Sequence, residues 1–244
     1  IIDDISNNGD HALIKYAKKF DNFTGTSFRM SDSDIAKCVD SLQEQTLKDI
    51  KFAQDQIRNF AEIQMKSISD TEVETFPGVV LGHKNIPIDS VGCYVPGGRY
   101  PMVASAHMSI ITARVAGCRR VIASTPPQDG LDPHPATIAA MHFAGVDEIY
   151  LIGGVQAIAG MALGTKEIQK VDMIVGPGNA YVAEAKRQLS GKLIGVESMY
   201  AGASEICVLA DKYTDINQVV TSLVSQAEHD SDSQCILVTK DKKI

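Results

Sequence analysis

The stretch of residues 171–189 constrains the fold of this chain more than any other. Its apolar segment 173–175 predicts a buried strand, and the Gly-Pro-Gly motif at 176–178 ends that strand. Asn179 is a residue favoured at helix N-caps, and residues 180–189 have the pattern of a helix. A strand, a glycine turn and a capped helix form the junction at which α/β proteins bind ligands. Free N–H groups at such a helix start favour an anion or a polar ligand edge, although a tight connection without a ligand shares this pattern.

Short apolar runs alternate with helical patterns from residue 86 onward. The predicted strands are 86–94, 120–124, 148–152, 173–175, 205–210 and 234–239. The predicted helices are 103–116, 136–144, 156–163, 180–189 and 216–228. This alternation predicts an α/β fold with a mainly parallel sheet, covered on both faces and joined by right-handed crossovers.

The residues before 86 follow a different pattern. Helices are predicted at 11–20, 32–41 and 47–66, and two extended runs at 72–76 and 79–83. Helical spacing in the third of these helices places five apolar residues on one face, namely Ile50, Ala53, Ile57, Phe60 and Ile63.

Three predicted strands end at glycine turns, at residues 96–98, 153–154 and 176–178. Because parallel strands bring their carboxyl ends to one edge of a sheet, these turns would line one crevice. The sequence contains neither the G-x-G-x-x-G fingerprint of ordinary dinucleotide-binding folds nor a phosphate-binding P-loop. The residues therefore predict a polar, glycine-lined cleft without an ordinary nucleotide motif.

Composition excludes some classes of partner. The 244 residues carry a net charge of −7 with no basic block, so nucleic acid is not an expected partner. No apolar run approaches the about 20 residues of a membrane-spanning helix, so we expect no membrane partner. Five scattered cysteines favour reduced thiols in the cytoplasm over a disulfide framework. Because the chain starts at Ile1 and stops at Ile244 soon after a strand, we expect a piece of a longer protein.

Gln226 and His229 form the most suggestive local cluster. At helical spacing they lie on one face, three residues apart. A neutral imidazole binds zinc well, but an amide oxygen is a weak ligand, and two ligands are fewer than a zinc site uses. The residues alone therefore favour a polar helix end over a metal site.

Arg99 and His107 are predicted to lie beside the cleft, in and after the turn at 96–98. A guanidinium there could bind an anion, and both side chains are candidate substrate contacts. An ordinary surface or capping role is the alternative for each.

Seven short motifs follow one another along the chain. They are YVPGG (94–98), VAGCRRV (115–121), GGVQAIA (153–159), GPGNAYV (176–182), AKRQ (185–188), AGASE (201–205) and SQAEH (225–229). In this order and spacing they closely resemble the histidinol dehydrogenase family. The resemblance covers essentially the whole chain.

The resemblance implies a zinc-dependent, NAD-linked enzyme that oxidises a primary alcohol to a carboxylate through an aldehyde, in two hydride transfers. The matching residues that contact NAD are Tyr94, Gln156 and Asn179. An atypical Rossmann-like domain in this family accounts for the missing fingerprint.

The resemblance also reverses the interpretation of Gln226 and His229. The matching residues of the family are zinc ligands that also touch substrate, and the residue matching Ser204 is a substrate contact. Zinc would act as a Lewis acid on the substrate hydroxyl. The catalytic Glu-His pair and the remaining zinc ligands would lie beyond Ile244, so we expect this stretch alone to bind zinc weakly and to be inactive.

Family organisation further implies a homodimer with two Rossmann-like α/β domains. Residues 92–210 would form the NAD-binding domain, and residues 1–91 with 211–244 would form part of the other. The C-terminal part of that other domain would be incomplete.

Substrate identity stays open between two alcohols. The family's reaction converts L-histidinol to L-histidine. However, the stretch 99–108 looks more like a branch that oxidises sulfonated propanediols, and an anionic sulfonate would suit Arg99. The Gly-Ala-Ser at 202–204 replaces the family's usual Gly-Pro-Ser in the substrate loop. An alternative of another class is a non-catalytic α/β binding module that keeps the cleft but not the metal.

Overall fold

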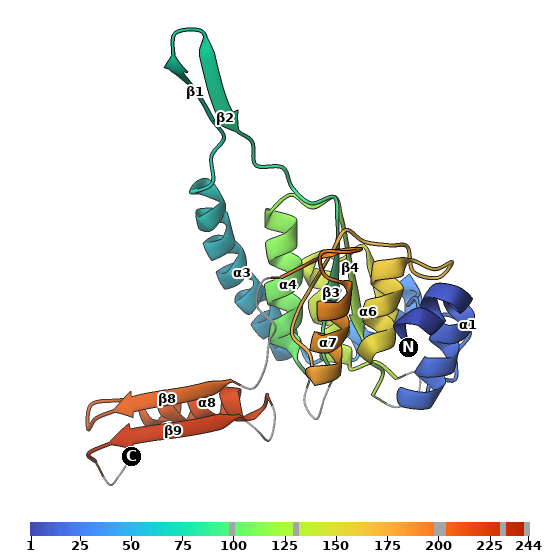
Figure 1. Ribbon diagram of the computed structural model, residues 1–244. Helices are drawn as coiled ribbons and strands as arrows, with labels where there is room; N and C mark the ends of the chain where they lie inside the picture. Colours follow the sequence, from blue (N-terminus) through green and yellow to red (C-terminus); the bar gives the residue numbers. More distant parts are fainter. Residues whose placement is uncertain (98–100, 129–131, 198–203, 230–232, 242–244) are drawn as a thin grey trace. The chain divides into compact units, whose positions relative to one another are not determined.

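The computed structural model describes residues 1–97, 101–128, 132–197, 204–229 and 233–241 (Figure 1). Its contacts divide the chain into two compact units. The described residues up to 197 belong to the first unit, and those from 204 onward belong to the second.

A parallel five-stranded sheet forms the centre of the first unit (Figure 1). Its strands are β3 (Ser90–Tyr94), β4 (Arg120–Thr125), β5 (Glu148–Leu151), β6 (Met173–Val175) and β7 (Gly195–Val196). The strand order is β5-β4-β3-β6-β7, and every neighbouring pair is parallel. The α/β class with a mainly parallel sheet is therefore confirmed.

Helices cover both faces of this sheet. They are α1 (Ile2–Phe20), α2 (Asp32–Asp40), α3 (Glu44–Lys66), α4 (Val103–Val115), α5 (Pro135–Ala144), α6 (Gly154–Leu163) and α7 (Ala180–Leu189). One group consists of α1, α6 and α7, in which α6 contacts both of the others. The other group consists of α2, α3, α4 and α5, in which α5 contacts α2 and α3, and α3 also contacts α4. Each group has its own buried core.

The alternation of side chains along the strands explains these two cores. Successive strand residues point to opposite faces of a sheet. Val121 and Ala123 of β4 thus lie in the core with α4 and α5, whereas Ile122 between them lies in the core with α1 and α6. Strands β3, β4 and β5 are buried on both faces, as expected for a parallel sheet between two helical layers.

The N-terminal region forms helix α1 and packs with the parallel sheet. The helix has a kink at Gly9, where φ is 51°, and its part after the kink corresponds to the predicted helix 11–20. The predicted division of the longer protein into two Rossmann-like domains stays a prediction. In this chain, residues 1–91 group with the parallel sheet, and residues 211–244 belong to the second unit. One reason is that Leu13 of α1 is fully buried in the same core as Ile158 of α6, so this helix completes one layer of the sheet.

Helix α3 does not bury all of its predicted face. Ile50 is buried and Ile57 packs against the core, but Phe60 and Ile63 are 62% and 60% exposed. At about 100° per residue, the buried stripe runs through Gln54 and continues to Ala61, both of which are buried. Phe60 and Ile63 therefore lie on another face of the helix.

Two strands, β1 (Thr71–Phe76) and β2 (Val79–His83), form an antiparallel hairpin whose residues are all exposed. In the second unit, β8 (Glu205–Ala210), α8 (Ile216–Ala227) and β9 (Gln234–Thr239) form a parallel strand–helix–strand motif. All five cysteines lie within the described residues and are free thiols. None of the described helices is long and apolar enough to cross a membrane.

Candidate functional site

The strand order of the first unit contains a topological switch point between β3 and β6. The chain moves outward from β3 through β4 to β5, and then returns to place β6 on the other side of β3. Open α/β sheets bind ligands outside the carboxyl ends of the strands at such a point. Tyr94 ends β3, and the turn at 176–178 follows β6, so both of these predicted features lie at the switch point.

Gly176 allows the turn after β6 to lie against β3. Its φ is 110°, and a Cβ atom at this position would overlap the carbonyl oxygen of Tyr94. Only glycine adopts such a conformation readily. The carbonyl oxygen of Gly176 also accepts a hydrogen bond from the buried ammonium of Lys186, which pairs with Glu197 at 2.6 Å. The turn is therefore held from both sides.

Asn179 is the N-cap of α7, as predicted. Its Oδ1 accepts hydrogen bonds from the backbone N–H groups of Tyr181 and Val182, both at 3.1 Å. This corrects the expectation of free N–H groups at this helix start, because the protein's own side chain satisfies two of them. The Asn179 side chain retains its Nδ2 group as a donor for a ligand.

Tyr94 and Gln156 bond to neighbouring parts of the start of α6. The Tyr94 hydroxyl accepts a hydrogen bond from the backbone N–H of Gly154 at 3.0 Å. Gln156 donates through Nε2 to Asp21 Oδ2 at 3.0 Å, and the same oxygen accepts from the N–H of Gly153 at 3.2 Å. Tyr94 and Gln156 are 4% and 1% exposed, so both side chains are buried where β3 meets the start of α6.

Burial also sets the protonation of this network. It raises the pKa of the Tyr94 hydroxyl to about 12, so the group stays neutral and can donate a hydrogen bond. Burial raises the pKa of Asp21 above its usual value, while the hydrogen bonds from Gly153 and Gln156 act in the opposite direction.

Asp21 was missed by the sequence analysis. It follows the last turn of an amphipathic helix, and nothing in its local pattern distinguishes it from a surface aspartate. Its partners lie more than 130 residues further along the chain. Such a contact becomes visible only when the two segments are placed together in space.

A cavity of about 410 Å³ borders the same turn on the α4 side of the sheet. Its lining includes Ser105 and Ser109 of α4, Met173 of β6, Gly176 and Glu197, and most of its surface is apolar. Glu197 Oε2 is buried there without a hydrogen-bond partner among the described residues. Tyr94, Gln156 and Asn179 do not line this cavity.

His107 lies in the packing between α3 and α4 rather than at the cleft. It is 3% exposed, and its Nδ1 accepts a hydrogen bond from Gln54 Nε2 at 3.0 Å. Burial lowers its pKa, which keeps the ring neutral. The structure thus gives His107 a structural partner in the packing between α3 and α4. Arg99 lies outside the described residues.

In the second unit, Ser204, Gln226 and His229 lie around the last turn of α8. Gln226 donates through Nε2 to the Ser204 hydroxyl at 2.7 Å and to the Ser204 carbonyl at 3.1 Å. His229 Nδ1 lies 3.0 Å from the carbonyl oxygen of Ser225. The structure therefore brings Ser204 and Gln226 into direct contact.

These hydrogen bonds determine which atoms are available to a metal. A carbonyl oxygen only accepts, so His229 Nδ1 must carry the proton and Nε2 holds the lone pair. Because the Ser204 carbonyl oxygen also only accepts, the Gln226 amide nitrogen must face Ser204. The amide oxygen Oε1 is then the atom of Gln226 that a metal could bind. An imidazole nitrogen and an oxygen are donors that zinc accepts. The pair therefore fits part of a zinc site, although no cluster of three His, Cys, Asp or Glu residues occurs in the described chain.

Comparison with known proteins identifies the family. The sequence model of the family described as histidinol dehydrogenase matches residues 1–244. The chain belongs to the histidinol dehydrogenase family. This confirms the resemblance that was based on the seven motifs.

Individual proteins with related names are similar to this chain in sequence or in structure. A "histidinol dehydrogenase homolog" of Shouchella clausii is 56% identical over 98% of this chain and 56% of that protein. A "sulfopropanediol 3-dehydrogenase" of Ruegeria pomeroyi is 46% identical over all of this chain and 55% of that protein. The crystal structure of histidinol dehydrogenase from Elizabethkingia anophelis superimposes with a TM-score of 0.88 at 37% identity, over 99% of this chain and 55% of that one. The chain thus spans about half the length of the relatives it matches.

Proposed function

We propose that the full-length protein containing this chain is a zinc-dependent dehydrogenase that oxidises a primary alcohol to a carboxylate with NAD, as in the conversion of L-histidinol to L-histidine. NAD would accept hydride, and zinc would polarise the substrate hydroxyl. The observation that carries the proposal is the hydrogen bonding of Gln226 and His229, which leaves one metal-binding atom on each side chain. Membership of the family supports it.

The residues of the first unit would bind the dinucleotide. Tyr94 ends β3, Asn179 follows the turn after β6, and the buried Gln156 lies at the start of α6. The Tyr94 hydroxyl, the Gln156 amide oxygen and the Asn179 amide N–H together supply donors and acceptors. This set suits the ribose hydroxyls and the carboxamide of NAD. Ser204 in the second unit would hold Gln226 in place and contact substrate.

Zinc content tests the metal part of this proposal. The full-length protein should retain zinc after dialysis, and His229→Ala and Gln226→Ala should each lose most of it, because a zinc site does not tolerate loss of a ligand. His83→Ala is the matched control, since His83 is an exposed histidine on β2. Retention of full zinc content by the His229 variant would contradict the metal site and favour a non-catalytic binding module.

A sulfonated diol is a second candidate substrate. The chain is more similar to the sulfopropanediol 3-dehydrogenase, at 46% identity, than to the histidinol dehydrogenase of known structure, at 37%. Turnover of L-histidinol and of 2,3-dihydroxypropane-1-sulfonate by the full-length protein separates the two. Failure on both alcohols would contradict both candidates.

We further propose that the protein acts as a homodimer in the cytoplasm. Exposed apolar side chains on α3 and on the β1–β2 hairpin support the dimer, since large apolar patches mark interaction surfaces. The five free thiols are typical of a reducing compartment.

A further inference from the structure

Asp21 places a carboxylate at the start of helix α6, among the residues of the proposed NAD site. One oxygen, Oδ2, accepts hydrogen bonds from the backbone N–H of Gly153 and from Gln156 Nε2. A negative charge at a helix N-terminus is electrostatically favourable, and both partners of Asp21 belong to the first turn of α6 or its N-cap. The end of α1 is thereby tied to the start of α6.

The bond to Asp21 fixes the orientation of the Gln156 amide. Because an ionised carboxylate only accepts hydrogen bonds, the amide must direct its nitrogen toward Asp21. Its oxygen then lies beside Gly154, where a Cβ atom would be 3.1 Å from Oε1. Gly154 in turn donates its N–H to the hydroxyl of Tyr94. The Gln156 oxygen is therefore the acceptor of this amide, and a ligand group that meets that oxygen must be a donor.

Asp21 also excludes one class of ligand from this helix start. The N–H of Gly153 already bonds to a carboxylate, and a second anion there would be repelled by it. We therefore expect no pyrophosphate at the start of α6. The group expected to meet the Gln156 oxygen is an uncharged donor, such as a hydroxyl or a carboxamide N–H.

We propose that Asp21 is a positioning residue of the dinucleotide site, which holds the Gln156 amide so that its oxygen accepts a hydrogen bond from a hydroxyl or carboxamide of NAD. This inference rests on the proposed function, because it takes NAD as the ligand of Gln156. Asp21 itself acts through Gln156 and the turn at 153–154 and need not touch the ligand.

Binding of NAD to the full-length protein, measured by calorimetry, tests the inference. Asp21→Ala should weaken NAD binding by about tenfold or more, as expected for loss of a hydrogen bond to a charged group. The KM for NAD should rise by the same factor, while kcat changes less. Asp21→Asn should recover most of the affinity, because its side-chain oxygen can still accept from Gly153 and Gln156.

Asp10→Ala is the matched control from the same helix. Asp10 also accepts hydrogen bonds from two backbone N–H groups, those of Lys166 and Glu167, at 3.1 and 3.3 Å. Its loss should lower the melting temperature as a structural tether would, yet leave NAD affinity within about twofold. An equal loss of NAD affinity in both alanine variants would reduce Asp21 to a general structural role and overturn the inference.

An exchange of partners provides a second test that does not depend on the folding of Asp21→Ala. Gln156→Glu places two carboxylates against each other and should weaken NAD binding. In the double variant with Asp21→Asn, the new amide at position 21 can donate to the new carboxylate at position 156. The double variant should therefore bind NAD more tightly than Gln156→Glu alone. Failure of this recovery would overturn the inference. Absence of NAD binding by the unsubstituted protein would instead overturn the proposed function and this inference with it.

Discussion

At the scale of single residues, the buried pair of Gln54 and His107 allows only one protonation state. Both hydrogens of the Gln54 amide are donated, one to His107 Nδ1 at 3.0 Å and one to the carbonyl oxygen of Ala140 at 2.8 Å. His107 Nδ1 must therefore accept, and a proton on it would face another donor. This adds to the effect of burial, which lowers the pKa of His107.

This pair predicts a dependence of stability on pH. The unfolded chain gains a proton on His107 near the ordinary pKa of 6.5, whereas the folded chain resists it to lower pH. The stabilisation is complete above pH 6.5 and is lost as the pH falls below it. In urea unfolding at pH 7 and pH 5, His107→Gln should show a smaller difference in the free energy of unfolding than the unsubstituted protein.

A control separates this effect from other histidines. Burial also lowers the pKa of His134, so part of the pH dependence should survive in the His107 variant. His83→Gln removes an exposed histidine and should leave the difference between pH 7 and pH 5 as it was. An unchanged difference in His107→Gln would contradict the prediction.

A second prediction at this scale concerns the buried ion pair of Lys186 and Glu197. The Lys186 side chain is 3% exposed and lies 2.6 Å from Glu197 Oε1. Lys186→Met keeps the length of the side chain but leaves the Glu197 carboxylate without its cation, which should lower the free energy of unfolding by about 3 kcal/mol. Lys37→Met, which breaks an exposed pair with Asp34, should change it by less than about 1 kcal/mol. Chemical denaturation measures both, and equal effects would contradict the burial argument.

At the scale of elements, Asn179 has a structural role at the start of α7 and a proposed binding role, and different atoms of its side chain carry them. Its Oδ1 caps the helix, and its Nδ2 is the donor proposed to meet NAD. Asn179→Asp keeps an oxygen acceptor for the cap but removes the donor and adds a negative charge. The melting temperature should therefore be nearly unchanged, while NAD affinity falls by about tenfold.

Asn179→Ala provides the comparison for this element. It removes both roles, so it should lose affinity and also about 1 kcal/mol of stability. Ser31→Ala removes the cap of α2, where Ser31 accepts from the Asp34 N–H, and should affect stability alone. Unchanged NAD affinity in Asn179→Asp would remove Asn179 from the proposed cofactor site.

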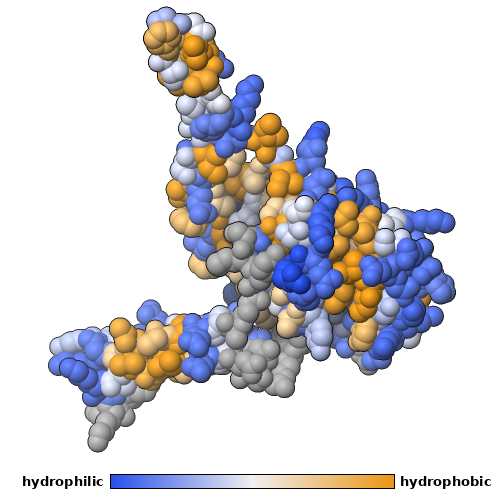
Figure 2. Space-filling model, viewed as in Figure 1, coloured by the Kyte–Doolittle hydropathy of each residue, from blue (hydrophilic) through white to orange (hydrophobic). Residues whose placement is uncertain are grey.

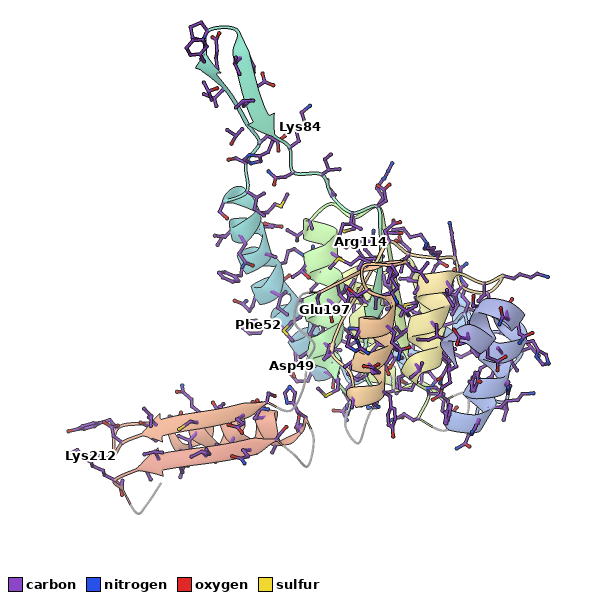
Figure 3. The ribbon with its side chains drawn as sticks, viewed as in Figure 1. Asp49, Phe52, Lys84, Arg114, Glu197 and Lys212 are labelled. Carbon is purple, nitrogen blue, oxygen red and sulfur yellow. The ribbon has the colours of Figure 1, made fainter. Side chains whose placement is uncertain are left out.

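At the scale of the whole molecule, α3 has apolar side chains on two faces. One face packs on α4 and α5, and the other exposes Phe52, Phe60 and Ile63. Phe52 projects from α3 to the outside in Figure 3. The β1–β2 hairpin exposes further apolar residues, including Phe76 and Leu81, and Figure 2 shows hydrophobic residues at its surface. This second apolar face is what a homodimer would bury.

Charge on this face should weaken the proposed homodimer. Phe60→Asp places a carboxylate where an apolar partner would pack, and size-exclusion chromatography with light scattering should show dissociation at concentrations at which the unsubstituted full-length protein is dimeric. Lys37→Asp, at an exposed position of α2 and not on this face of α3, is a control for added negative charge. A Phe60→Asp variant with an unchanged mass would place the dimer contact elsewhere.

The sequence alone determined the features that depend on local pattern. Alternating apolar runs and helical spacing established the parallel α/β sheet, and Asn179 was identified as a cap because capping involves residues two and three positions away. Ordered motifs established the family, since their combination is far more specific than any one of them. The pairing of Gln226 with His229 at a metal, which was inferred from helical spacing and the family resemblance, stays a prediction.

The tertiary structure decided the contacts between distant segments. Asp21 meets Gln156, which lies 135 residues away, and His107 meets Gln54 across two helices. Periodicity also placed Phe60 on the apolar face of α3 that was expected to be buried. In the structure Phe60 is exposed, and Gln54 is buried on the face that packs against the core. Hydrogen bonding and burial depend on which surfaces meet in space, and a pattern along the chain specifies a face of a helix but not its neighbour.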